Sequence, residues 1–239
     1  MVMSRETFLA VASIFSVVLF FGLFYFLTGR RVLNRLISHM PVSKESGEFI
    51  SYKLAGIMMT GAIPFIIFIS ATGMPLSEIG FQTRNIDRIG YLVGGLILLA
   101  VVSAYFSAKS TNVQRSAPEL RIKVWRPRHI ILSSAVWIIY LFGYELFFRG
   151  ILWFLCCNAF GFVWALIINV TLYSLVHVPK GKLVTCGAIP LGTLFCTLSY
   201  YSGSFLPAFL IHTAMAVSTE LFSVFHNPEF RFGRKGLAE

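Results

Sequence analysis

The sequence predicts an all-α, polytopic transmembrane helical bundle, and two properties of the chain carry that prediction. Of its 239 residues, 56% are hydrophobic and only 13% are charged, whereas soluble domains carry about 25% charged residues. The apolar residues also gather in long runs that short basic stretches separate. Because a helix needs about 20 mostly apolar residues to cross a bilayer, these runs indicate membrane spans.

Seven apolar runs are candidates for spanning helices. A further run, Ile151–Phe160, has only about 10 residues, so we expect it to form a short re-entrant or interfacial helix. The run Leu183–Tyr200 contains Gly187, Pro190 and Gly192, which membrane helices tolerate better than soluble ones. The predicted spans are Phe8–Leu27, Leu54–Ala71, Ile89–Ser107, Ile130–Phe148, Phe162–Val176, Leu183–Tyr200 and Phe205–Phe225.

We expect these runs to form one membrane domain over residues 1–239. Residues 1–128 hold three spans without a recognisable signature, and residues 129–226 hold the unusual polar side chains. The first span is long and lacks a small-residue cleavage pattern, which favours an uncleaved signal anchor.

The distribution of basic residues indicates the orientation of the chain. They concentrate after the first, third, fifth and seventh spans, while the opposite side carries only Arg5, Arg84, Arg88 and Arg149. The positive-inside rule therefore places the N-terminus outside and the C-terminus in the cytoplasm of a cell membrane. Contact with the anionic lipid bilayer accounts for the net charge of +10, so no nucleic-acid partner is expected.

Ionisable side chains inside apolar spans are costly and point to function. Glu145 and Arg149 are four residues apart, which puts them on one face of a helix. His212 interrupts the seventh span, and His177 ends the fifth. We expect Glu145, His177 and His212 to line one polar cavity, because a glutamate can take a proton from water and a histidine can stabilise an oxyanion or bind a metal.

Structural roles are the alternatives for each of these residues. Glu145 and Arg149 together form a plausible ion pair at a helix end, and His177 alone fits a polar residue at the membrane interface. Glu220 lies two turns beyond His212 on roughly the same face, where its carboxylate could reach the cavity from the cytoplasmic side, but we expect it to extend along the helix toward the interface.

Three short motifs occur in order in the second half of the chain. They read YELFFRG at residues 144–150, YSLVH at 173–177, and GSFLP at 203–207 ahead of His212. They resemble, in turn, the Glu-Glu-x-x-x-Arg, Phe-x-x-x-His and Gly-Ser-x-x-Pro motifs of the CAAX protease and bacteriocin-processing membrane peptidases, the CPBP or Abi family. The resemblance covers about Tyr140 to Phe225.

The resemblance implies an intramembrane endopeptidase, a hydrolase in which a glutamate activates water to attack a peptide bond of a membrane-associated peptide or protein. We expect Glu145 to be the base, Arg149 to orient it, and His177 and His212 to position the water or the oxyanion. No cofactor is certain, but Glu145, His177 and His212 would be the ligands if a divalent metal such as zinc is bound. The family's distribution suggests a bacterial inner membrane.

Two positions depart from the family pattern and support a second hypothesis. Tyr144 stands where the family has the first of its two glutamates, and Ala216 stands where it often has an asparagine. Loss of one oxyanion donor typically lowers turnover by about 10²–10³. The alternative is therefore a catalytically silent member that acts as a membrane binding, immunity or accessory protein. A transporter is a third hypothesis, although no inverted repeat supports it.

Overall fold

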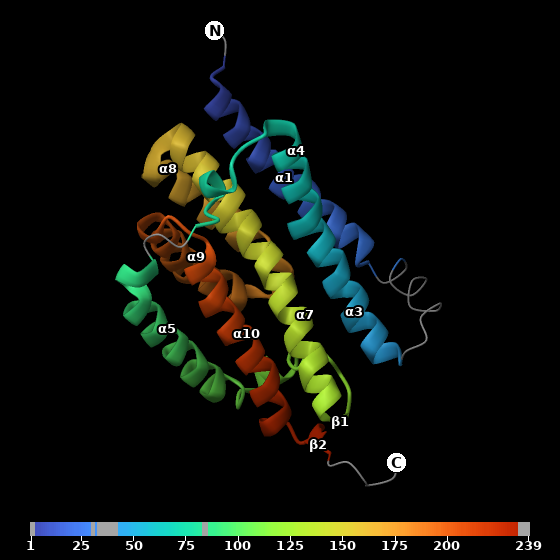
Figure 1. Ribbon diagram of the computed structural model, residues 1–239. Coiled ribbons are helices and arrows are strands. Elements are labelled where there is room, and N and C mark those ends of the chain that lie inside the picture. The colour runs from blue at the N-terminus through green and yellow to red at the C-terminus, as the bar shows by residue number, and fades with distance from the viewer. Residues whose placement is uncertain (1–2, 30–31, 33–42, 83–85, 234–239) are drawn as a thin grey trace.

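The computed structural model describes residues 3–29, 32, 43–82 and 86–233 (Figure 1). Six helices in this part of the chain are long and apolar enough to cross a membrane, which indicates a multi-pass membrane protein and confirms the all-α class. Much of the loop after the first span, Arg84 and residues 234–239 lie outside the described residues.

The elements follow one another as helices with few irregular connections. In chain order they are α1 (Arg5–Leu27), α3 (Lys44–Ile57), the π-helical η1 (Met58–Ala62), α4 (Ile63–Thr72), the 3-10 turn η2 (Leu76–Ile79), α5 (Ile86–Ser107), α6 (Thr111–Gln114), β1 (Val124–Trp125), α7 (Pro127–Glu145), the π-helical η3 (Leu146–Leu152), α8 (Trp153–Leu175), the 3-10 turn η4 (Val178–Lys180), α9 (Lys182–Ser202), α10 (Leu206–His226) and β2 (Arg231–Phe232).

The helices pack around α7 and α10. Helix α10 lies against both α5 and α7, α3 packs on α7, and α8 packs on both α1 and α9. Figure 1 shows α7 and α10 side by side, with α5 beside α10 and with α1, α3 and α4 on the far side of α7. The buried core contains many aromatic rings contributed by α1, α7, η3 and α8.

The number of long helices differs from the seven predicted spans because α7, η3 and α8 run on as one helix from Pro127 to Leu175. This helix bends at Gly161, whose φ of 75° suits a residue without a Cβ. The bend falls at the predicted boundary between the short helix and the fifth span. The remainder, Phe162–Leu175, extends about 21 Å at 1.5 Å per residue, which is less than a bilayer core of about 30 Å.

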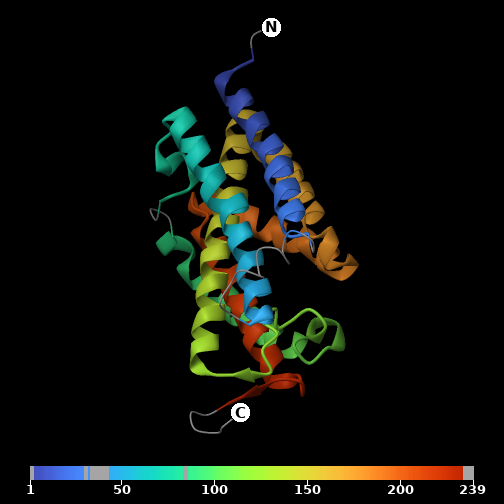
Figure 2. The ribbon, with the colours of Figure 1, turned by 90° about the vertical axis from the view of Figure 1, so that its right-hand side faces the viewer.

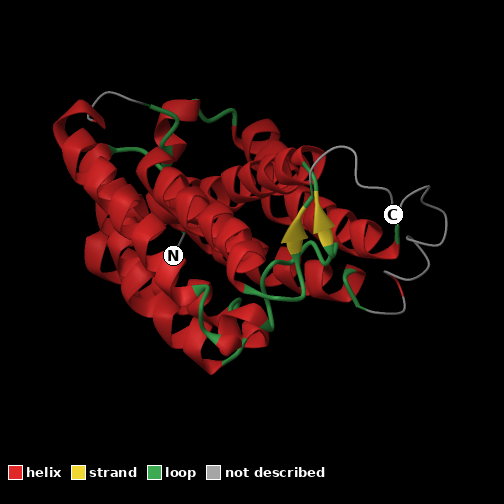
Figure 3. Cartoon of the chain, turned by 90° about the horizontal axis from the view of Figure 1, so that it is seen from below, coloured by secondary structure: helices red, strands yellow, loops and turns green. Residues whose placement is uncertain are grey.

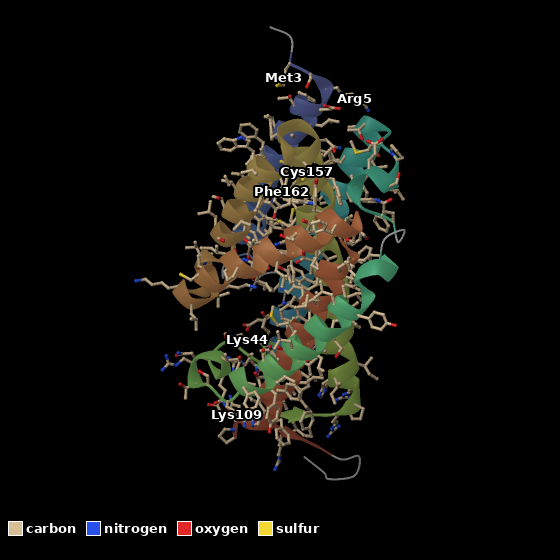
Figure 4. All side chains as sticks on the ribbon, turned by 90° about the vertical axis from the view of Figure 1, so that its left-hand side faces the viewer. Met3, Arg5, Lys44, Lys109, Cys157 and Phe162 are labelled. Carbon is tan, nitrogen blue, oxygen red and sulfur yellow. The ribbon has the colours of Figure 1, made fainter. Side chains whose placement is uncertain are left out.

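The short second half of α8 returns the chain to the middle of the molecule. Figures 2 and 4 show the turn between α8 and α9 about halfway down, with α9 running obliquely across the bundle. The end of α8 therefore lies at mid-height on the bundle and not at one of its ends. His177, which follows this helix, is buried as a result.

The second predicted span begins earlier than expected, at Lys44 instead of Leu54. The Ser43 side chain caps this helix by accepting a hydrogen bond from the Ser46 amide at 3.3 Å. Lys53 therefore lies inside α3 and is buried, where the sequence suggested a loop residue.

Further along the same helix, η1 comes very close to α7. A Cβ added to Gly61 would lie only 2.8 Å from the Gly143 Cα, so both positions require glycine for this approach. Helix α7 is thereby fixed just before Tyr144 and Glu145.

The loop between α5 and α7 closes the lower end of the bundle. Its strand β1 pairs in parallel with β2, in the register Val124 to Arg231, as Figure 3 shows from below. Lys44 and Lys109 lie toward this end and Arg5 lies at the opposite one (Figure 4).

A buried carboxylate holds this loop. Glu220 of α10 accepts hydrogen bonds from the amides of Glu119 and Leu120 at 2.8 and 3.1 Å, and from the Ser133 hydroxyl of α7 at 3.2 Å. The expectation that Glu220 reaches toward the interface is therefore wrong, because its oxygens are used to bind loop amides.

Glu119 in turn binds Lys53 of α3, with 2.7 Å between the carboxylate oxygen and Nζ. Burial alone would raise the pKa of the Glu119 carboxyl, but the ammonium outweighs burial and lowers it. The Lys53 ammonium also lies 3.0 Å from the centre of the Trp137 ring.

Candidate active site

Glu145 and Arg149 are presented by the junction of α7 with the π-helical segment η3. Both side chains are completely buried, and Arg149 Nη1 lies 3.3 Å from Glu145 Oε2. The guanidinium also lies 4.0 Å from the centre of the Tyr173 ring, in a cation–π contact. π-Helical segments within longer helices are frequent at functional sites.

Asn169 of α8 stabilises η3 through hydrogen bonds of its side-chain amide. Its side-chain Nδ2 donates a hydrogen bond to the Phe148 carbonyl at 2.7 Å, while its oxygen accepts one from the Cys196 thiol of α9 at 3.2 Å. One buried amide thus ties η3 to α8 and α9.

His212 reaches Glu145 from α10. The His212 Nδ1 lies 2.5 Å from Glu145 Oε1, and since the carboxylate is the acceptor, Nδ1 carries the donated hydrogen. The turn before α10 fixes this approach. Gly203 adopts a φ of +67°, and the Ser204 hydroxyl donates to the Gly80 carbonyl at 3.0 Å, immediately ahead of Pro207 at the helix start.

His177 is held by its own helix end. Its Nδ1 lies 2.7 Å from the Tyr173 carbonyl, which can only accept, so Nδ1 carries the hydrogen and Nε2 presents a lone pair. Burial, followed by the positive charge of Lys180, lowers the pKa of the His177 imidazole to about 3. Tyr25 of α1 donates to the neighbouring Val176 carbonyl at 2.6 Å and secures the turn.

The ring of Tyr144 connects the two histidines. Its centre lies 6.3 Å from that of His177 and 6.0 Å from that of His212, with nearly perpendicular ring planes. The rings of Phe148, Tyr140 and Phe21 pack against the same tyrosine at 4.9, 5.9 and 5.9 Å. Within the described part of the chain, the buried Tyr144 hydroxyl has no hydrogen-bond partner.

The structure thus brings all four predicted residues to one region. Glu145 contacts Arg149 and His212 directly, and Tyr144 links them to His177. His212 is buried and does not face lipid.

Sequence reasoning missed Asn169 and Tyr25, and it noted Tyr144 only as a departure from a motif. Nothing marks Tyr25 in the sequence, because an aromatic residue in an apolar run is usually a packing residue. An amide in the middle of a predicted span is a signal that could have identified Asn169.

A metal site does not fit this arrangement. Among the described residues, no three His, Cys, Asp or Glu side chains are grouped as ligands. One expected ligand, Glu145, instead binds another, His212, whereas a catalytic zinc site needs three donors directed at one point.

Comparison with known proteins bears on the same region. A family model described as "Type II CAAX prenyl endopeptidase Rce1-like" matches residues 125–218, a range that includes Tyr144, Glu145, Arg149, His177 and His212. No curated protein and no solved structure matches the chain. Residues 125–218 therefore form a domain similar to the type II CAAX prenyl endopeptidases, the CPBP family that the three motifs predict.

Proposed function

We propose that the protein is an intramembrane endopeptidase of the CAAX type, acting on membrane-associated peptides or proteins. The observation that carries this proposal is the buried Glu145–His212 pair, with 2.5 Å between Oε1 and Nδ1, in contact through Tyr144 with a second histidine. Buried ionisable groups are retained in membrane spans chiefly where they serve a function.

The hydrogen bonds of the two histidines give them different roles. His177 donates through Nδ1 to a backbone carbonyl, so the lone pair that could accept a proton from water is on Nε2. His212 binds the Glu145 carboxylate through Nδ1, and when Nε2 also carries a hydrogen that N–H is suited to donate to an oxyanion. Arg149 fixes the carboxylate from its other side.

In this mechanism, a water oxygen attacks the peptide carbonyl carbon while one of its protons moves to His177 Nε2. The carbonyl electrons move onto the oxygen, and His212 stabilises the resulting oxyanion. The C–N bond then breaks as His177 returns the proton to the leaving nitrogen. Glu145 acts through His212, which modifies the sequence-based expectation that it accepts the proton itself, because one of its oxygens lies against Arg149 and the other accepts a hydrogen bond from His212.

A second candidate function is that of a silent family member that binds a membrane peptide without cleaving it. Tyr144 favours this alternative, because an aromatic ring occupies the position of the family's first glutamate and packs against both imidazoles. The described site then retains Glu145 as its only carboxylate, and that carboxylate is completely buried.

The test is cleavage by the purified full-length protein in phosphatidylcholine–phosphatidylglycerol vesicles. The probe is a quenched-fluorescence peptide that ends in a farnesylated CAAX sequence, alongside its unprenylated counterpart. We expect wild type to cleave, His177→Ala to lower the rate by about 10²–10⁴, and Glu145→Gln to lower it by about 10²–10³.

His226→Ala is the matched control, since His226 lies at the far end of the same helix as His212 and packs on Tyr105. It should cleave like wild type. Peptide binding without cleavage by wild type would establish the silent alternative. Undiminished cleavage by Glu145→Gln would exclude the proposed mechanism.

A further inference from the structure

The Tyr144 hydroxyl is a buried polar group for which the described structure supplies no partner. The residue is 4% exposed, and the hydroxyl oxygen is inaccessible and unbonded. Leaving such a group unsatisfied destabilises the folded protein, so it calls for an explanation. A phenylalanine would fill the same aromatic environment without this cost.

The position of the ring within the site suggests what the hydroxyl does. Tyr144 contacts both imidazoles and directly precedes Glu145. The ring is also fixed by Phe21, Phe148 and neighbouring tyrosines, so it cannot reorient freely. An oxyanion is stabilised best by a hydrogen-bond donor that is already in position when the negative charge develops. A donor on a fixed ring meets this requirement, because it need not move during the reaction.

One turn beyond His212 in the same helix, α10 presents Ala216, which has no side-chain donor. In the proposed mechanism, His212 Nε2 is the donor that α10 supplies to the oxyanion, and Ala216 adds none. A phenol is protonated near neutral pH and can donate one hydrogen bond. Among the described residues that contact the imidazoles, Tyr144 has an unused donor.

We propose that the Tyr144 hydroxyl is a second oxyanion donor of this site, a catalytic group that acts together with His212. The inference rests on the proposed endopeptidase function. Under this inference Tyr144 takes part in the reaction, whereas under the silent alternative it is only a packing residue.

Tyr144→Phe tests the proposal, because it removes the hydroxyl and keeps the ring. With the farnesylated peptide in the same vesicles, we expect kcat to fall by about 10²–10³ while KM stays within about twofold, as for loss of an interaction made only in the transition state. Tyr140→Phe is the matched control, since Tyr140 lies one turn earlier, is equally buried and packs on Tyr144. It should retain the wild-type kcat.

The outcomes separate this inference from the function on which it rests. Equal kcat for wild type and Tyr144→Phe would overturn the inference and leave the endopeptidase function intact. No cleavage by wild type would overturn both. A fall in kcat for Tyr144→Phe with wild-type thermal stability in detergent excludes misfolding as the cause and supports the proposal.

Discussion

Glu145, His177 and His212 illustrate which residues of the site could be predicted from the sequence. Each places a polar group in or beside an apolar run, and the cost of such a group in a membrane makes it conspicuous. Tyr144 illustrates the opposite case. Its contacts come from α1, α7, η3, α8 and α10, and no local pattern encodes a meeting of five elements.

The lowered pKa of His177 predicts a pH-dependent stability. The unfolded chain binds a proton on this histidine near its ordinary pKa of about 6.5, whereas the folded protein does so only near a pKa of about 3. Stability should therefore fall as the pH decreases from about 6.5 toward 3, by up to about 1.4 kcal/mol per pH unit from this group.

The measurement is thermal unfolding in detergent between pH 7.5 and 4.5, for wild type and His177→Asn. Asparagine retains a donor near the Nδ1 position but does not titrate, so the variant should lose less stability on acidification. Parallel pH profiles for the two proteins would contradict the assignment of a neutral, buried His177.

At the scale of elements, apolar length predicted the helices but not their interruptions. No bend was predicted at Gly161, although it lies between the predicted short helix Ile151–Phe160 and the predicted span that begins at Phe162. The π-helical segments η1 and η3 were not expected, because η1 lies inside a predicted span and η3 continues the helix across Arg149 from one predicted run into the next. The helical stretch Lys44–Lys53 was also missed, because its polar composition resembles a loop and its burial depends on a distant glutamate.

That distant ion pair gives a prediction for α3 and the loop before α7. Glu119→Gln leaves the Lys53 ammonium, 1% exposed, without its carboxylate. We expect a loss of about 3 kcal/mol in the free energy of unfolding, near the low end for a broken buried pair because Glu119 is 30% exposed. Unfolding in mixed detergent micelles measures this loss.

The double variant Lys53→Met/Glu119→Gln is the control for that experiment. It removes both charges and keeps an unbranched side chain among the rings of Trp137 and Tyr140, so most of the lost stability should return. A double variant as unstable as Glu119→Gln alone would show that the pair is not the cause.

At the scale of the whole molecule, the spans without a motif complete the site. Helix α1 supplies Phe21 against Tyr144 and the Tyr25 hydroxyl that holds the Val176 carbonyl. Helix α3 packs on α7, where Gly56 leaves room for the Tyr140 ring. The sequence gives no sign of these roles, because contacts between distant helices leave no periodic signal. The first two predicted spans therefore build part of the site although they carry no signature.

The orientation of this bundle is the remaining whole-molecule prediction. The basic residues place the loop before α7 in the cytoplasm and the turn between α9 and α10 outside. Lys123 and Tyr201 are exposed positions in these two regions, Tyr201 with 68% of its surface accessible. Single cysteines at the two sites, in a variant without native cysteines, report their sides through a membrane-impermeant maleimide. In intact cells we expect labelling of Tyr201→Cys alone, with Lys123→Cys labelled only after permeabilisation. Labelling of both or of neither in intact cells would contradict the predicted topology, and the reverse pattern would place the N-terminus inside.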